Sequence, residues 1–250
     1  MRADEWVVCL GWDVGGWMGR KHGAAAVAWQ LSTRSVQWLG SPSQFRLPGP
    51  FLPFLDFVTQ AVGGGDLGLL EDARLIVGID APLGYPSAYR RLVAGEAVVP
   101  NRFEREIDNV FAYRRTERHV QEELGKKPLS APFDKLGNNA SVAISHARQW
   151  SAENGLTVVP FRDASASDGV IIEVYPALSK TKDGVAVPAL SQWMPNGVKV
   201  GTDAYDAAIC ALTALAFAAG GKVDGLPEVC ELDQDYPEIA EEGWIYYMLS

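Results

Sequence analysis

Short apolar runs alternate with polar, glycine-rich and proline-rich segments along this chain. The run at 6–12 is continuously apolar, which is typical of a buried central strand. Runs at 23–31 and 35–39 follow after short connections, and short connections between strands predict antiparallel hairpins. An amphipathic pattern at 54–62 predicts a helix, and the run at 75–79 predicts a fourth buried strand. Because a helix separates the third and fourth strands, we expect a parallel crossover between them.

The middle of the chain, from about 84 to 160, differs in character and carries mostly helical patterns. These patterns lie at 87–94, 101–124 and 140–154. We interpret the region as a helical insertion. The run at 170–175 then predicts a fifth strand, and a closing helix is expected from Thr202, with apolar residues nearly all round between 207 and 219.

The predicted order is three hairpin strands, a helix, a strand, helical material, a strand and a closing helix. This is the element order of the ribonuclease H fold. We therefore predict an α/β protein with a ribonuclease H-like mixed five-stranded sheet, flanking helices and a helical insertion between strands four and five. A length of 250 residues and 48% hydrophobic content suit a single domain over residues 1–250.

Four aspartates lie where this fold brings separate elements together. Asp13 and Asp80 each end an apolar run, and the first and fourth strands are neighbours at the centre of the predicted sheet. Asp203 and Asp206 lie three residues apart on one face of the closing helix. Charge at the entrance to an apolar helix is costly unless it is paired or binds a metal. We therefore expect Asp13, Asp80, Asp203 and Asp206 to be catalytic carboxylates.

Each acid also has a purely structural interpretation. Asp13 could begin an Asx-turn, Asp80 could cap a turn, and acids in the first turn of a helix favour its dipole. Glu173 is a charged residue within an apolar strand, which is unusual, and it is either a further metal ligand or an edge residue that faces solvent. Hard oxygen ligands select Mg²⁺ or Mn²⁺. We expect one of these ions as cofactor, with Asp13, Asp80, Asp206 and Glu173 as its ligands.

The formal net charge of −9 means that the surface as a whole does not attract nucleic acid, so a nucleic-acid enzyme needs a local basic patch. Arg114, Arg115 and Arg118 form the main local basic feature. It is either a phosphate-contacting surface or a solvated helix face with local charge pairs. We expect these three arginines to bind the substrate.

The three cysteines, Cys9, Cys210 and Cys230, are odd in number and lack metal-ligand spacing. Two lie in apolar contexts, which favours reduced core cysteines and a cytoplasmic protein. The acidic start of the chain is unlike a signal peptide. The longest apolar stretch is too short to cross a bilayer comfortably, so we expect no membrane partner.

Several short motifs occur in a fixed order along nearly the whole chain. They are Gly11-Trp-Asp13, Ile79-Asp-Ala-Pro-Leu83, Arg115-Thr-Glu117-Arg118, Glu173-Val-Tyr-Pro176, Asp203-Ala-Tyr-Asp-Ala-Ala-Ile-Cys-Ala211 and Glu242-Gly-Trp-Ile245. The ordered set resembles the family of domain of unknown function 429 (DUF429). That family is regarded as predicted nucleases with a ribonuclease H fold, so the resemblance implies both. The motif at 203–211 also resembles the last helix of the RuvC Holliday-junction resolvases, which carries two metal-site aspartates. The acid that ends the fourth strand here is Asp80, shorter than the glutamate usual there.

Three functions remain open at this stage. The first is a metal-dependent nuclease for DNA or RNA, in which Asp13 bridges two ions about 3.5–4 Å apart, with Asp80 and Asp206 on opposite sides and Asp203 close by. The second is an ATP-dependent kinase of the actin-like superfamily, because Asp13-Val-Gly-Gly resembles its first phosphate motif, although no second copy of that motif is found. The third is a non-catalytic binding protein on the same fold. Of the helical pair, we expect Asp206 to be the more buried and the direct ligand.

Overall fold

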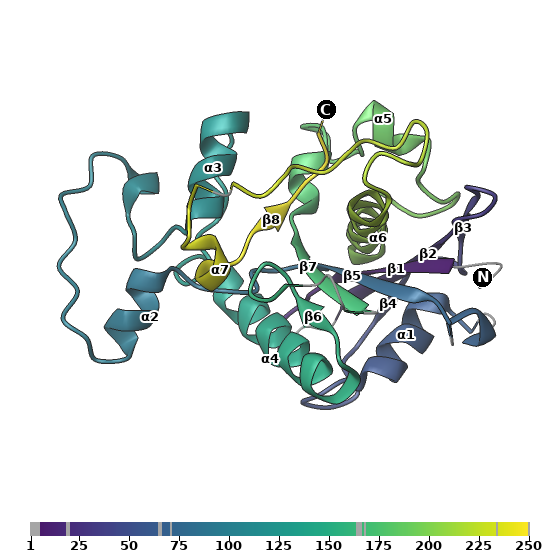
Figure 1. Cartoon of the computed structure of the whole chain (residues 1–250), viewed down its shortest axis with the longest axis horizontal. Coiled ribbons are helices and arrows are strands. Elements are labelled where there is room, and N and C mark those ends of the chain that lie inside the picture. The colour runs from purple at the N-terminus through teal and green to yellow at the C-terminus, as the bar shows by residue number, and fades with distance from the viewer. Residues whose placement is uncertain are drawn as a thin grey trace.

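The computed structural model describes residues 6–18, 21–64, 67–70, 72–163, 167, 169–233 and 235–249. Its centre is one mixed sheet (Figure 1). The strands are β1 (Trp6–Asp13), β2 (His22–Gln30), β3 (Val36–Trp38), β4 (Ser43–Phe45), β5 (Arg74–Asp80), β6 (Thr157–Val158), β7 (Gly169–Val174) and β8 (Ile245–Tyr246). The helices are α1 (Phe54–Val62), η1 (Leu67–Leu70), α2 (Ser87–Val93), η2 (Glu106–Asp108), α3 (Arg115–Leu124), α4 (Leu136–Asn154), η3 (Pro176–Ser179), α5 (Pro188–Ser191), α6 (Asp203–Ala219) and α7 (Ile239–Glu242).

The strand order is β3-β2-β1-β5-β7-β6, with β4 also paired to β2 and β8 to β7. The pairs β1–β2, β2–β3 and β2–β4 are antiparallel. The pairs β1–β5, β5–β7, β6–β7 and β7–β8 are parallel. An antiparallel start followed by parallel strands is consistent with a ribonuclease H-like arrangement, and it places β1 and β5 side by side at the centre.

All five predicted strands are present, but the described sheet has eight strands rather than five. The three additional strands, β4, β6 and β8, are only two or three residues long. Such short segments carry no alternation of their own and become strands only because a longer neighbour pairs with them.

The region between β5 and β7 contains α2, α3 and α4, so its helical character is as predicted. One predicted helix, at 101–124, is wrong over its first half, because α3 begins at Arg115. The Asp108 carboxylate accepts a hydrogen bond from the Arg105 backbone, which closes the short helix η2 on itself. A second turn start, at Arg114, opens α3. Two local helix starts therefore replace one continuous helix.

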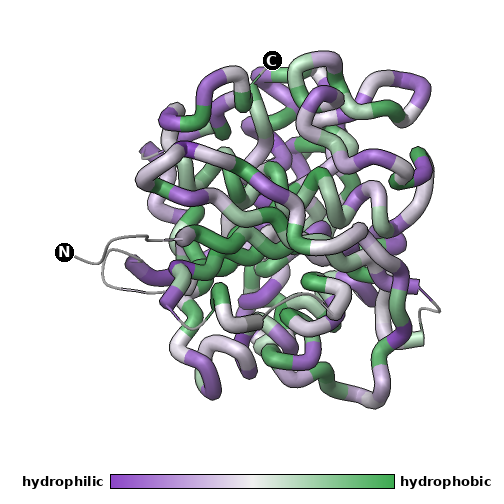
Figure 2. Tube along the Cα trace, turned by 90° about the vertical axis from the view of Figure 1, so that its right-hand side faces the viewer, coloured by the Kyte–Doolittle hydropathy of each residue, from purple (hydrophilic) through white to green (hydrophobic). Residues whose placement is uncertain are grey.

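Helices cover both faces of the sheet (Figure 1). α6 packs on one face with inward side chains such as Cys9 and Ile76, whereas α1 and α4 pack on the other with Leu10, Trp12 and Val77. Figure 2 shows the hydrophobic segments gathered in the middle of the molecule. Because side chains alternate along a strand, one continuously apolar strand supplies both cores.

All three cysteines are buried and free, as the sequence suggests. Among the described residues, none of the helices combines the length and the apolar character that crossing a membrane requires.

Candidate metal site at the ends of β1 and β5

Asp13 and Asp80 end two neighbouring parallel strands and are register partners of each other. Two residues earlier, Gly11 and Gly78 face the backbone of α6. Residues two apart on a strand share a face, so both aspartates lie on the α6 side of the sheet. The convergence predicted for these two acids is therefore present.

Gly11 and Gly78 also allow α6 to approach the sheet closely. A Cβ added at Gly11 would lie 1.9 Å from the carbonyl oxygen of Ala207, and one at Gly78 would lie 2.6 Å from that of Cys210. Only a hydrogen atom fits at these positions. Because the two glycines are register partners, they form a flat patch on which the helix backbone rests, next to the two aspartates.

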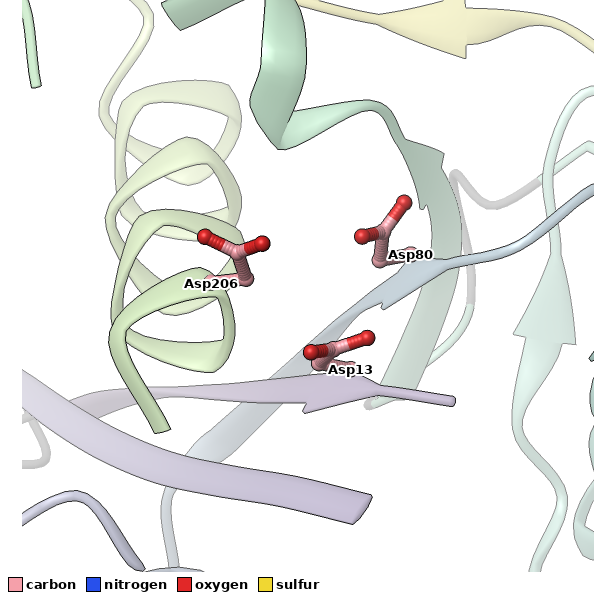
Figure 3. A group of neighbouring side chains, drawn as sticks. All are labelled: Asp13, Asp80 and Asp206. Atoms are coloured by element: carbon pink, nitrogen blue, oxygen red, sulfur yellow. The ribbon is translucent and has the colours of Figure 1, made fainter. Parts of the chain in front are cut away.

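The first turn of α6 brings a third carboxylate to the same place. Thr202 has an extended backbone, and its hydroxyl accepts a hydrogen bond from the Tyr205 backbone, which caps the helix. Asp13, Asp80 and Asp206 each offer a carboxylate oxygen, and these oxygens lie within 4.8 Å of one another. Figure 3 shows the three side chains facing the space between α6 and the ends of β1 and β5. We call this group the aspartate cluster.

The aspartate cluster is short of positive charge. Burial, followed by repulsion from the neighbouring aspartates, raises the pKa of Asp13 to about 9. Burial and repulsion from Asp206 raise the pKa of Asp80 to about 8. The nearby cation is Lys180, whose Nζ lies 2.6 Å and 2.8 Å from the two carboxylate oxygens of Asp206. With one lysine for three carboxylates, the raised pKa values mean that Asp13 and Asp80 hold protons near neutral pH, and a divalent cation would displace these protons.

Two other predicted acids lie outside the aspartate cluster. Within the part of the chain that the structure describes, the group able to hold an ion contains neither Asp203 nor Glu173. Asp203 accepts a hydrogen bond from Gln44 and acts on the cluster through its charge. Glu173 accepts a hydrogen bond from the Leu83 backbone and pairs with Arg114. The Glu173 carboxylate is therefore engaged by the buried Arg114 guanidinium, and its predicted role as a metal ligand stays a prediction.

Arg114 lies in the interior and is 0% exposed. Its guanidinium pairs with Glu117 and Glu173 and donates to the carbonyl oxygen of Glu242 at 3.1 Å. This position contradicts the substrate contact predicted for Arg114, because the guanidinium does not reach the surface where a phosphate could bind. We call Arg114, Glu117 and Glu173 the arginine network.

Arg115 and Arg118 do not form an open basic patch either. Arg115 lies over the ring of Tyr236, 3.6 Å from its centroid, and pairs with Glu122 at 3.1 Å and Asp233 at 3.4 Å. Arg118 is half-buried. The partners of Arg114 and Arg115 come mostly from distant parts of the chain, so local spacing could not reveal them.

The arginine network also supports the segment that leaves Asp80. Glu173 holds the Leu83 backbone at 2.9 Å. Glu242 accepts from the Ser87 backbone at 2.7 Å and from the Arg115 backbone at 2.8 Å. Three sequence motifs therefore meet in one buried region beside the aspartate cluster, where they hold the backbone in place. They are Arg115-Thr-Glu117-Arg118, Glu173-Val-Tyr-Pro176 and Glu242-Gly-Trp-Ile245.

Lys180 was not predicted as part of the site. It forms an isolated bridge with Ala186, whose backbone donates to the Tyr205 hydroxyl at 2.8 Å. This contact with α6 brings the lysine to Asp206, 26 residues further along the chain. No periodicity or motif marks such a contact.

A family model described as "Protein of unknown function (DUF429)" matches residues 11–192 of the chain. The match includes Asp13 and Asp80 but ends before α6. No curated protein and no solved structure matches significantly.

Proposed function

The chain belongs to the DUF429 family, and from its aspartate cluster we propose that it is a metal-dependent nuclease that hydrolyses phosphodiester bonds in DNA or RNA. One observation carries the proposal: three carboxylates from three separate elements lie within 4.8 Å of one another. The strand order and the places of these acids in it support assignment of the fold to the ribonuclease H-like class.

The donor atoms fit a small divalent cation. Carboxylate oxygens are the ligands that Mg²⁺ and Mn²⁺ prefer. Mg²⁺ holds oxygens at about 2.1 Å, so two oxygens on opposite sides of it are about 4.2 Å apart. The oxygens of the cluster lie within 4.8 Å of one another, which is close to this length, and all three residues are partly exposed. An ion and a phosphate can both reach them.

When bound, the cation supplies Lewis-acid chemistry, since it polarises a phosphoryl oxygen and lowers the pKa of an attacking water. Asp13 and Asp80 would hold it from the sheet, and Asp206 would hold it from the helix. Asp203, at the rim, adds negative charge and fixes the Gln44 side chain. The three aspartates provide ligands for one ion, and the second ion proposed from the sequence would need oxygens from the substrate.

Lys180 has a place in this scheme as the positive group at the edge of the cluster. In the metal-free protein its Nζ neutralises Asp206. With a cation bound at Asp206, Lys180 would be free to contact a phosphate oxygen or the leaving group. Lys180 and Asp206 are both partly exposed, so this rearrangement needs only a change of side-chain rotamer.

The test compares two carboxylates on one helix. Purified protein is incubated with Mn²⁺ and with labelled single strands, duplexes, RNA, hybrids and branched junctions. We expect Asp206→Asn to reduce kcat by about 100-fold or more, as loss of a group that stabilises transition-state charge does. Asp203→Asn is the matched control, since it removes an equal charge one helical turn away, and its loss should be smaller.

The opposite ranking would reverse the assignment of the two aspartates. If the wild-type protein cleaves none of these substrates but hydrolyses ATP, the kinase interpretation replaces the nuclease.

A further inference from the structure

A groove runs along the outer side of α4, on the sheet face opposite α6. Its larger part has a volume of about 790 Å³ and lies between α4, the segment after Asp80 and the segment around Phe161. A second hollow of about 560 Å³ shares Tyr85, Ile144 and Arg148 with the first, so the two are continuous. We call this surface the α4 groove.

The α4 groove carries two arginines that pair with no acid among the residues the structure describes. Arg148 and Arg162 are exposed, and neither forms an ion pair within the described residues. A third, Arg90, pairs with Glu241 at the edge of the groove. The guanidinium groups of Arg148 and Arg162 are therefore available to an anionic ligand. Their planar guanidinium groups suit phosphate oxygens.

Aromatic and apolar side chains lie between these charges. Tyr85 and Phe161 line the groove and are half-buried, so part of each side chain remains accessible. Ile144 and Ala147 on α4 complete an apolar wall. A surface that combines partly accessible rings with cations suits a chain of unpaired bases and phosphates, because a base can stack on the accessible part of a ring. A duplex hides the base faces that such a surface contacts.

The α4 groove and the aspartate cluster lie on opposite faces of the sheet, so a strand bound in the groove would reach the cluster around the edge of the sheet near Asp80. Tyr85 follows Asp80 by five residues, so their Cα atoms are at most about 18 Å apart. Leu136, the first residue of α4, borders a small hollow together with Asp80. Ser141, where the groove begins, lies five residues further along the helix, a rise of about 7.5 Å.

We propose that the α4 groove binds a single-stranded segment of nucleic acid, with Arg148 and Arg162 on its phosphates and Tyr85 and Phe161 against its bases. The proposal rests on the proposed nuclease function in that the bound strand is the substrate. Binding itself needs no metal, so it can be measured separately.

The experiment measures anisotropy of a fluorescent single-stranded 12-mer, as DNA and as RNA, in EDTA and across a salt series. We expect the double variant Arg148→Gln, Arg162→Gln to bind at least about tenfold more weakly, with a salt slope lower by about 1.4, since two single-strand phosphate contacts are lost. The control is Arg34→Gln, Arg74→Gln, which removes the same charge. Arg74 begins β5 and Arg34 follows the end of β2, so both lie at the opposite end of the sheet from Asp13. This control should bind like the wild type.

Four results would overturn the proposal: no binding of either single strand, tighter binding of a duplex of the same sequence, equal losses in the two double variants, or full displacement of the strand by micromolar AMP. The two proposals fail separately. If binding depends on the groove but no metal-dependent cleavage occurs, the nuclease proposal fails and the groove proposal stands. If cleavage and binding are unchanged in the variant Arg148→Gln, Arg162→Gln, the groove proposal fails and the nuclease proposal stands.

Discussion

The aspartate cluster and the arginine network are neighbouring groups of acids that differ in how far their negative charge is balanced by cations. In the arginine network two glutamates share one arginine, and the guanidinium and the Glu173 carboxylate also bind backbone groups. In the aspartate cluster three carboxylates share one lysine and keep partial access to solvent. The two groups adjoin, because Glu173 contributes to the raised pKa of Asp80.

This difference distinguishes acids that stabilise the fold from acids that can bind an added ion. A buried charge that has its counter-charge and its hydrogen bonds holds the chain in place and has nothing left to bind. Clustered carboxylates without enough cations are costly in the folded protein and gain from an added ion. Charge balance, rather than the presence of acids alone, therefore identifies the site.

The largest expected effect comes from breaking the balanced group. Arg114→Leu leaves Glu117 and Glu173 buried without a cation, and loss of one partner of a buried pair costs about 3–5 kcal/mol. Urea unfolding at pH 7 measures the change in free energy of unfolding. Arg91→Leu is the control, since its pair with Glu96 is exposed and its loss should change stability little. A small effect of Arg114→Leu would mean that the network does not support the fold.

The second effect comes from relieving the unbalanced group. The pKa of Asp13 is raised from 3.8 to about 9, so the folded protein holds this proton more tightly than the unfolded chain does. Its contribution to stability is therefore present below about pH 4 and is lost as pH rises to about 9. Asp13→Asn cannot lose that proton. In EDTA the variant should have a higher Tm than the wild type, by a margin that grows from pH 5 to pH 9.

Addition of Mn²⁺ should narrow this difference in Tm. The wild type gains about 2.7 kcal/mol when the ion is at 100 times its Kd, whereas Asp13→Asn has lost a ligand and gains little. Thermal unfolding at each pH, with EDTA and with Mn²⁺, measures both effects. An equal Mn²⁺ shift in the two proteins would exclude Asp13 from the site.

The smallest effect concerns the lysine that partly balances the cluster. Lys180→Met removes the ion pair with Asp206, which is partly exposed, so the metal-free protein should lose only about 1 kcal/mol or less. Mn²⁺ binding measured by calorimetry should become tighter, because a competing cation has left Asp206. Weaker Mn²⁺ binding would show instead that Lys180 supports the site.

The sequence revealed the parts of the molecule that depend on short-range patterns. Continuous apolar runs located the five main strands, and the acids that end β1 and β5 met as expected because parallel strands in register end together. The resemblance to the DUF429 family is confirmed. Thr202 correctly marked the start of α6.

What the sequence could not supply are partners brought together by folding. Glu173 resembled a ligand because a charged residue in an apolar strand needs a partner, but that partner is Arg114, 59 residues earlier. Arg115 resembled a surface residue in the sequence, but in the fold it contacts Asp233 and Tyr236 from the far end of the chain. In each case the residue type predicted that an interaction occurs, whereas the fold determines which residue is the partner.

The paired glycines under α6 have a consequence for which ion the site accepts. Gly11 and Gly78 fix the gap between helix and sheet, and that gap sets the span between Asp206 on one side and Asp13 and Asp80 on the other. The preferred radius of a bound ion would thus depend on the lack of side chains at Gly11 and Gly78 as much as on the carboxylates. A methyl group at Gly11 would act as a spacer that lifts the helix, and the site would then favour a larger ion such as Ca²⁺, with oxygens at about 2.3–2.6 Å, over Mg²⁺. Selectivity for the size of the metal would then depend on Gly11 and Gly78, which do not contact the metal.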